Sequence, residues 1–348
     1  MSRLFRLLLG TLGCFLFVIV MASAEETAST SETVEQHLIT LPVKFVNQEG
    51  RPVGDVEVSP WALRSSQGHG QWNDERTGYP VPEQVKSDAN GMVEVQYPFY
   101  ANPKEHVLTT QVTLSVDHPE YVFKSHQNIN VPYEEDEPFL VELEKGVTVE
   151  IEPIENGKPT DLKALHCLWS DGRSWLSGAS PTVTQQGTLR IPPLSEGKSQ
   201  VLLVRLDGEH ATHFSPIDTV EGKAGEVVKH RLELLPAVRI TGRLSDNVPR
   251  PIHNGRVCVS TLPEKHHLHS VDWWSWSPIA EDGKFVIERW PATQPIQVTA
   301  LCDHYIARSG DTPSGIEPRD PDPYWRPQTF QPSQFSEELL IEMQPMVR

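Results

Sequence analysis

Three glycines that end polar turns lie 96 residues apart, and this repeat constrains the fold more than any other feature of the sequence. The turns end at Gly91, Gly187 and Gly283, and each is followed by alternating apolar and polar residues. A tight turn that leads into a half-buried strand needs both features. The interval is too long for a solenoid repeat and matches a whole small β domain. The sequence therefore predicts three β domains in tandem.

Other landmarks recur in the same order within each predicted module. An opening strand precedes a proline-containing turn, and a late apolar strand and a closing strand follow the glycine turn. Closing and opening strands abut at Gly146 and again at Pro236, which leaves almost no linker. The predicted modules are residues 38–145, 146–236 and 237–348, and the third contains a long proline-rich loop, 307–332.

Composition supports an all-β fold. The chain has 348 residues with 30 prolines and 22 glycines, two residue types that helix interiors exclude. It shows neither a collagen period nor sustained heptads, and long amphipathic helical patterns are missing. Strand spacing and turn chemistry predict three immunoglobulin-like β-sandwiches of about seven strands each.

The first 24 residues predict a cleaved secretory signal. Arg3 and Arg6 precede an apolar run from Leu7 to Met21, and Ala22-Ser-Ala24 has the small-residue pattern of a cleavage site. The alternative is a retained membrane anchor, but the run is shorter than the about 20 residues of a bilayer span. Residues 25–37 predict a disordered acidic leader. The mature protein is therefore expected outside the cytoplasm, secreted, periplasmic or at the cell surface, without a stable membrane span.

Net charge narrows the choice of partners. The chain carries 47 acidic against 30 basic residues, and cleavage of the signal would remove two of the basic ones. Nucleic acid and anionic membrane surfaces would both repel such a protein. A protein or polysaccharide outside the cytoplasm remains as the expected partner.

Three cysteines remain after signal cleavage, so at least one has no intramolecular partner. Cys258 and Cys302 lie in predicted strands of the third module, where an oxidising compartment would permit a disulfide. The alternative is a pair of buried thiols. Cys167 is expected to be a small buried residue.

The end of the second module and the third module carry motifs of a known family: Leu232-Glu-Leu-Leu-Pro-Ala-Val-Arg-Ile-Thr-Gly-Arg-Leu-Ser-Asp246, then Pro251, Val257-Cys-Val259 and Glu281-Asp-Gly283-Lys-Phe285. They resemble the carboxypeptidase regulatory-like domain, a transthyretin-like β-sandwich. The first module is a second match, through Asn47–Val53 and Ser87–Gly91, whereas the second module lacks the aspartate before its turn glycine. The resemblance implies non-catalytic accessory modules in a secreted protein.

Signatures of common enzymes are missing from the sequence, which has no GxSxG, HExxH, P-loop or CxxC pattern. One loop places His266, His267 and His269 near Asp272, which makes a metal-dependent hydrolase the weakest alternative considered. Adjacent histidines tend to point apart, and a solvated loop is the preferred interpretation. We therefore expect no catalytic residue, no bound metal and no cofactor.

The chain has nine tryptophans, and this large number is the most informative feature of its composition. A cluster follows the second strand of every module, and the candidate ligand or partner residues are Trp72, Trp175, Trp273, Trp274, Trp276 and Trp325. Such rings fill a core, stack on sugars or anchor a protein partner. Because adjacent strand residues face opposite sides, Trp273 and Trp274 cannot both enter one core. One of them should be exposed or meet a neighbouring domain.

Together these features predict a non-catalytic, exported β-sandwich protein that acts as a structural or interaction scaffold of the bacterial envelope or extracellular space. The alternative is a carbohydrate-binding protein that uses the tryptophan clusters. The two hypotheses differ in whether the tryptophans are interior or exposed.

Overall fold

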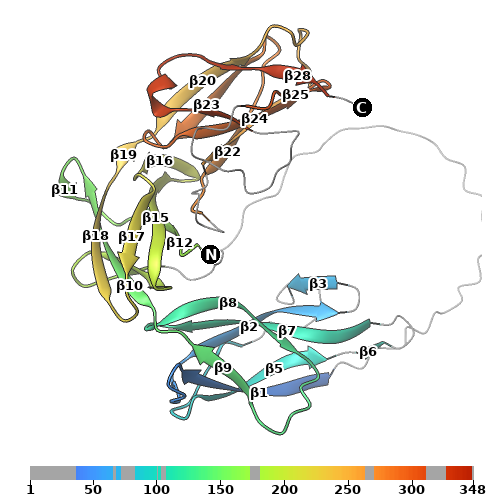
Figure 1. Ribbon diagram of the computed structural model, residues 1–348, viewed down its shortest axis with the longest axis vertical. Helices are drawn as coiled ribbons and strands as arrows, with labels where there is room; N and C mark the ends of the chain where they lie inside the picture. Colours follow the sequence, from blue (N-terminus) through green and yellow to red (C-terminus); the bar gives the residue numbers. More distant parts are fainter. Residues whose placement is uncertain are drawn as a thin grey trace, which may run out of the picture. The chain divides into compact units, whose positions relative to one another are not determined.

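The computed structural model is all-β and describes residues 37–65, 68–71, 83–99, 101–102, 107–172, 181–262, 270–310 and 327–346. This part of the chain holds no α-helix, and its one helical segment is the 3-10 turn η2 (Pro332–Gln334). The predicted fold class is confirmed. Figure 1 shows the strands in sequence order from blue to red.

The first module comprises β1 (His37–Asn47), β2 (Glu57–Ser65), β3 (Gly68–Gln71), β4 (Val85–Lys86), β5 (Met92–Phe99), β6 (Ala101–Asn102), β7 (Val107–His118), β8 (Tyr121–Asn130) and β9 (Phe139–Leu143). The second comprises β10 (Val147–Glu155), β11 (Lys158–Pro159), β12 (Leu165–Ser170), β13 (Thr182–Val183), β14 (Leu189–Leu194), β15 (Gly197–Asp207), β16 (His210–Phe214), β17 (Asp218–Gly222), β18 (Val227–Glu233) and β19 (Leu235–Pro236). The third comprises β20 (Val238–Leu244), β21 (Gly255–Thr261), β22 (Trp274–Pro278), β23 (Lys284–Trp290), β24 (Ile296–Cys302), β25 (Tyr305–Ala307), β26 (Gln328–Phe330), β27 (Leu339–Ile341) and β28 (Met343–Pro345).

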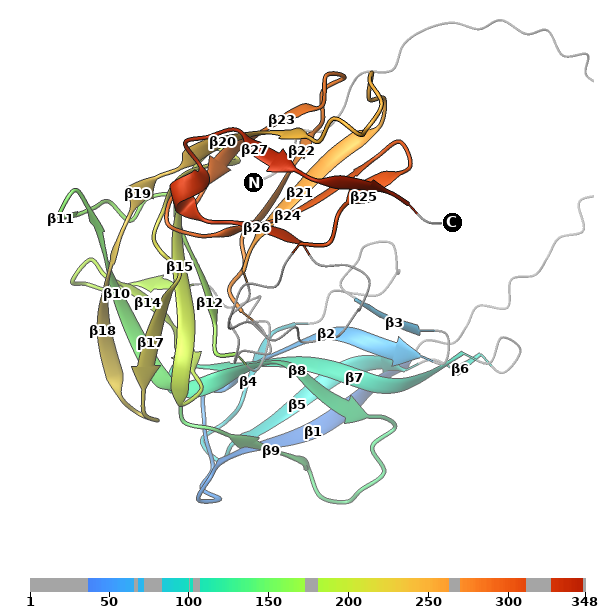
Figure 2. The same ribbon diagram turned by 45° about the horizontal axis from the view of Figure 1, so that its top comes forward.

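All three modules share one strand topology. In one sheet the opening strand pairs antiparallel with the strand after the glycine turn and parallel with the closing strand, in the orders β5-β1-β9, β14-β10-β18 and β23-β20-β27. The other sheet is built on the antiparallel series β2-β7-β8, β12-β15-β16 and β21-β24-β25. Figures 1 and 2 show the two layers of the first module from different sides. The sequence repeat is therefore a repeat of topology.

The repeated turn glycines have the same conformation. Gly91, Gly187 and Gly283 have φ angles of 75°, 76° and 90°. In each turn the glycine N–H donates to the carbonyl oxygen three residues earlier, at 2.9, 3.1 and 2.8 Å. Only glycine adopts this left-handed conformation without steric cost, which explains why it recurs at this place.

Each module ends by crossing from its first sheet to its second. After β9 the chain pairs Lys145 with Tyr121, and the equivalent pairings join β19 to β16 and β28 to β25. The next opening strand begins at Val147 after β9 and at Val238 after β19. The connecting residues thus belong to the preceding sandwich, and almost no free linker remains.

The modules have separate cores, which are the hydrophobic interiors between their two sheets. Phe45 and Tyr97 lie in the first, Ile151 in the second and Trp290 in the third, each almost fully buried. The indole N–H of Trp290 donates to the carbonyl oxygen of Gln294 at 3.0 Å, so this deeply buried polar group is satisfied.

Strand β15 is buried on both sides. Residues 199–204 are all buried, which breaks the alternation of a half-solvated strand. Val201 and Leu203 face the core of the second module. Leu202 and Val204 face a second cluster, formed with Phe214 and with Val271 and Trp273 of the third module.

Polar and aromatic contacts support this junction between the second and third modules. The Val271 N–H donates to the side-chain oxygen of Gln200 at 2.9 Å, and the rings of Phe214 and Trp273 meet edge to face at a centroid distance of 4.9 Å. Edge-to-face pairs add specific stabilisation to the area that they bury. The junction is therefore a packed hydrophobic contact.

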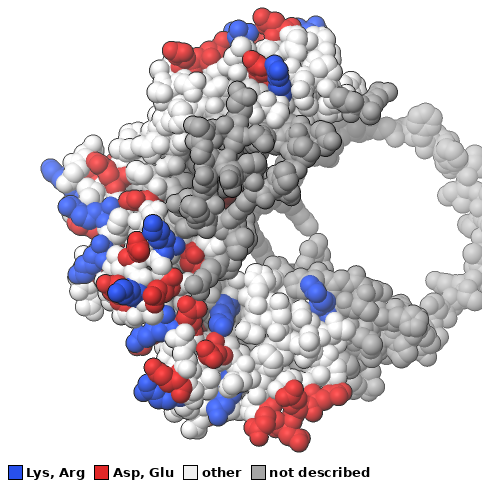
Figure 3. Space-filling model, viewed as in Figure 1, with Lys and Arg blue, Asp and Glu red and all other residues white. Residues whose placement is uncertain are grey.

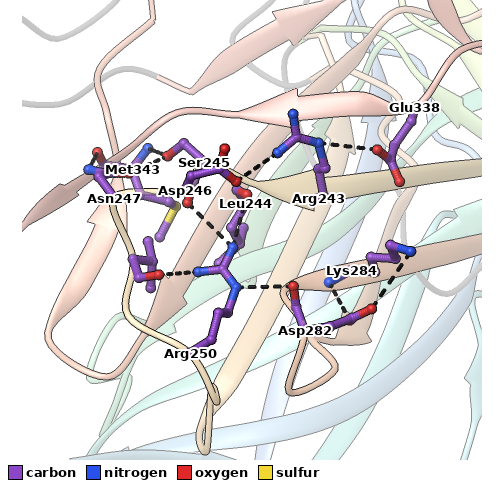
Figure 4. Close-up of polar contacts among 11 residues, drawn as sticks. Arg243, Leu244, Ser245, Asp246, Asn247, Arg250, Asp282, Lys284, Glu338 and Met343 are labelled. Atoms are coloured by element: carbon purple, nitrogen blue, oxygen red, sulfur yellow. Dashed lines mark hydrogen bonds and ion pairs between the residues drawn. The ribbon is translucent and has the colours of Figure 1, made fainter.

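Arg250 holds together the chain segments around the third glycine turn (Figure 4). Its guanidinium donates to the carbonyl oxygens of Asp282 at 3.0 Å and Leu244 at 3.1 Å, and also to that of Val248. A Cβ on Gly283 would lie 2.4 Å from a guanidinium nitrogen of Arg250. Glycine therefore provides both the turn conformation and the space for this side chain.

We expect Arg250→Ala to lower the free energy of unfolding by about 1–3 kcal/mol, because four backbone carbonyls, the fourth being that of Ser245 at 3.4 Å, lose a charged donor. Arg239→Ala is the control, since Arg239 makes an exposed ion pair with Glu288 and should contribute at most about 1 kcal/mol. Chemical denaturation of the two variants measures the difference. Equal losses would contradict the role assigned to Arg250.

The predicted Cys258–Cys302 disulfide is not formed, and the alternative of two buried thiols is only half right. Both residues lie in adjacent strands of one sheet, but Cys258 is exposed on its outer face whereas Cys302 points into the core. Side chains on opposite faces of a sheet cannot be bridged. Burial raises the pKa of the Cys167 thiol to about 12, and it raises the pKa of Cys302 as well, which leaves both thiols unreactive near neutral pH.

Candidate ligand-binding face

Two tryptophans of the third module lie on the outer face of a sheet and are exposed to solvent. Trp274 is 67% exposed and Trp276 is 53% exposed. Both belong to β22, where they are separated by one residue and so point to the same side. Trp273 immediately precedes this strand and packs into the junction with the second module. Trp273 and Trp274 therefore do not both enter one core, as expected from the sequence, which left open which of the two is exposed.

The strand register defines the surroundings of the exposed rings. Val257, Val259 and Val298 of β21 and β24 point into the third core, so their neighbours along each strand point outward. The outward residues form three rows across β22, β21 and β24: Trp274, Ser260 and Gln297; Trp276, Cys258 and Thr299; Pro278, Arg256 and Leu301. We call these nine residues the tryptophan face.

The tryptophan face is aromatic and polar, and it has a single charged side chain. It contains no acidic residue, although the chain has 47 of them. Its only charged side chain is Arg256, whose guanidinium carbon lies 4.8 Å from the ring centroid of Trp276. This cation–π contact orients the ring and leaves guanidinium N–H donors beside it. Hydroxyl and amide groups of Ser260, Gln297 and Thr299 supply further hydrogen-bonding groups.

Parts of the surface outside the tryptophan face are densely charged. Ion pairs cross the first sheet of the second module, from Arg190 to Glu150 at 2.6 Å and from Arg231 to Glu152 at 3.0 Å. Figure 3 shows positive and negative side chains intermixed over this module, and acidic side chains gathered beyond the sheets of the first module, where Glu134–Glu137 are exposed. These surfaces are typical of solvated faces, which sets the tryptophan face apart.

The remaining candidate residues all lie outside the described residues: Trp72, Trp175, Trp325, His266, His267 and His269. Of the other tryptophans, Trp169 packs against the second core, and the indole N–H of Trp61 donates to the carbonyl oxygen of Ser125 at 2.9 Å. These two rings serve packing.

Within the described ranges, no group of three or more histidine, cysteine, aspartate and glutamate side chains could hold a metal ion. One charged cluster there joins Glu155 to Arg205, with Thr160 donating to the carboxylate at 3.0 Å and His213 at 3.6 Å from it. The hydrogen bond from Arg205 is the main cause that lowers the pKa of Glu155. This carboxylate is therefore ionised at neutral pH and serves as a link between β10, β15 and β16.

Sequence reasoning named Trp274 and Trp276 among six candidate tryptophans without deciding which are exposed, and it missed the residues beside them. Arg256 and Leu301 received no functional assignment, although the alternation of Val257, Cys258 and Val259 already places Arg256 outward. The pairing of β21 with both β22 and β24 could not be obtained from alternation, because it depends on register.

No helix of the described chain is long and apolar enough to cross a membrane. No protein-family model matches the sequence, and no curated protein matches it either. The resemblance to the carboxypeptidase regulatory-like domain therefore stays a prediction.

Solved structures with some similarity include three bacterial pilins. A streptococcal ancillary pilin matches with 11% identity over 90% of this chain and 100% of that chain, at a TM-score of 0.24. The shaft pilin of Lactobacillus rhamnosus GG matches with 8% identity over 58% of this chain and 99% of its own, at a TM-score of 0.24. The major pilin subunit of Bacillus cereus matches with 10% identity over 88% and 99%, at a TM-score of 0.21. TM-scores of this size leave the function to be inferred from the chain's own surface.

Proposed function

We propose that the protein is an exported, non-catalytic β-sandwich scaffold of the bacterial envelope or extracellular space, and that its third module binds a ligand on the tryptophan face. The exposure of Trp274 and Trp276 carries this proposal. Full burial of a large apolar side chain stabilises a fold by roughly 1.5–3 kcal/mol, which these two positions forgo. Because the side chains of Trp274 and Trp276 do not serve packing, we attribute their presence on the surface to ligand binding.

The junction supports the same role. Trp273 fixes the start of β22 against the second module, while the next residues of the strand present the tryptophan face. A binding surface on a rigid sheet holds its side chains in place before the ligand arrives, which reduces the entropic cost of binding. The family resemblance supports an accessory role without catalysis.

The exported location in this proposal can be tested by expressing the full chain. We expect a bacterial host that expresses the full chain to release it from the cytoplasm as a product that begins at Glu25, after cleavage of the Ala22-Ser-Ala24 site. Cell fractionation and intact-mass measurement give the result. Retention in the cytoplasm with residues 1–24 still attached would contradict the proposal.

A further inference from the structure

We propose that the tryptophan face binds a neutral polysaccharide, with sugar rings stacked on Trp274 and Trp276. This inference rests on the proposed function and names the class of ligand that it takes. Three observations carry it: the nature of the groups on the face, its charge and its size.

The groups on the face match the two surfaces of a sugar ring. A pyranose presents C–H bonds on its flat sides and hydroxyl groups around its rim. Exposed indole rings offer an apolar flat surface for the C–H sides of the sugar. Hydrogen-bond donors and acceptors for its hydroxyl groups come from Ser260, Gln297 and Thr299, which lie in the same rows as the two tryptophans. A purely apolar partner would leave these polar groups without hydrogen bonds.

The charge of the face favours an uncharged ligand. Arg256 is its only charged residue, and its guanidinium is already engaged with the ring of Trp276. The whole chain has a formal net charge of -17, so an anionic polymer would be repelled at long range. A cationic peptide would find no carboxylate on the face itself.

The size of the face fits a short stretch of a polysaccharide. Strands lie about 4.8 Å apart and rise about 3.3 Å per residue, so the three strands and five residues of the tryptophan face span roughly 10 by 13 Å. A single polymer chain, one sugar ring wide and a few rings long, fits along this surface.

Trp274 and Trp276 can act as successive contacts along one chain. They are two positions apart on a single strand, so their Cα atoms are about 7 Å apart. Binding energy should therefore be shared by the two rings, and each substitution should weaken binding without abolishing folding, because both side chains are exposed.

The test is retention of the exported protein on regenerated cellulose, chitin and insoluble mannan, with an alginate gel as the anionic control. We expect retention on at least one neutral polysaccharide and none on alginate, with little change when the salt concentration is raised. Trp274→Ala and Trp276→Ala should each weaken binding about tenfold or more, the effect of losing one stacked ring. Trp276→Phe keeps an aromatic ring and should retain most of the affinity.

Val227→Ala is the matched control, since Val227 is 54% exposed in β18 of the second module and should leave binding unchanged. Thermal unfolding of every variant verifies folding. Retention on none of the three neutral polysaccharides, retention on alginate alone, or binding that survives both tryptophan substitutions would overturn the inference. Retention that disappears when the polysaccharide is first treated with protease would indicate a protein partner and would also overturn it. A protein that is exported and cleaved but binds no polysaccharide would refute this inference and leave the proposed function standing.

Discussion

Replacing Gly91 with alanine is expected to destabilise the first module by about 2–5 kcal/mol, the largest effect among the turn positions. The added Cβ would lie 2.3 Å from the carbonyl oxygen of Phe45, a backbone atom within β1 that cannot move without distorting its sheet. Overpacking of this kind costs about 1–3 kcal/mol. The left-handed conformation adds about 1–2 kcal/mol for any residue with a Cβ.

Gly187→Ala provides a control with the same turn and nearly the same φ. Apart from the glycine itself and its two chain neighbours, no atom of the described residues lies within 4 Å of a Cβ at Gly187, so only the conformational cost of about 1–2 kcal/mol is expected there. Denaturant unfolding, followed by hydrogen exchange to identify the affected module, measures both losses. Equal losses at the two positions would show that the contact with Phe45 contributes nothing.

Trp273→Ala is expected to loosen the second module from the third and to cost about 2–4 kcal/mol, somewhat less than the about 3–5 kcal/mol of a fully buried tryptophan. Its ring covers one side of β15 together with Phe214 and Val271. Without it, Leu202 and Val204 would face a cavity or water. We therefore expect a shared calorimetric transition of the two modules to separate into two.

Trp273→Phe distinguishes packing from other roles of this residue. The Nε1 of Trp273 is buried and has no hydrogen-bond partner among the described residues, so phenylalanine removes an unsatisfied donor while it keeps the aromatic contact. We expect a clearly smaller loss than with alanine. Trp274→Ala, one residue along the chain, should leave the transition unchanged because that ring is exposed. A transition that is unaffected by Trp273→Ala would show that the junction does not couple the modules.

The repeat could be predicted from the sequence because local chemistry dictates it. Gly91, Gly187 and Gly283 must be glycine for a backbone reason, and the alternation after each is the signature of a strand with one buried face. The junction could not be predicted in the same way. The unbroken apolar run Val201–Val204 signals a strand buried on both sides, but only tertiary structure shows that Trp273 covers it.

For Cys258 and Cys302, the alternation of inward and outward side chains along each strand was enough to predict which way each thiol points. Cys258 lies between Val257 and Val259, two core residues, so it must point away from the core, whereas Cys302 continues the inward series of Val298 and Ala300. Counting positions along each strand would have excluded the disulfide. The tryptophan face could not be obtained in this way, because Trp276 and Thr299 come to lie in one row only through the register of three strands.

Oxidative labelling of tryptophans, read by mass spectrometry, can show that Trp274 and Trp276 are exposed to solvent while Trp273 and Trp290 are held inside. In the native protein, the peptide containing all three clustered tryptophans should gain label at Trp274 and Trp276 first, with Trp290 unlabelled until the protein unfolds. Labelling at Trp273 or Trp290 as fast as at Trp274, or protection of Trp274 and Trp276, would show that the tryptophan face is not presented to solvent.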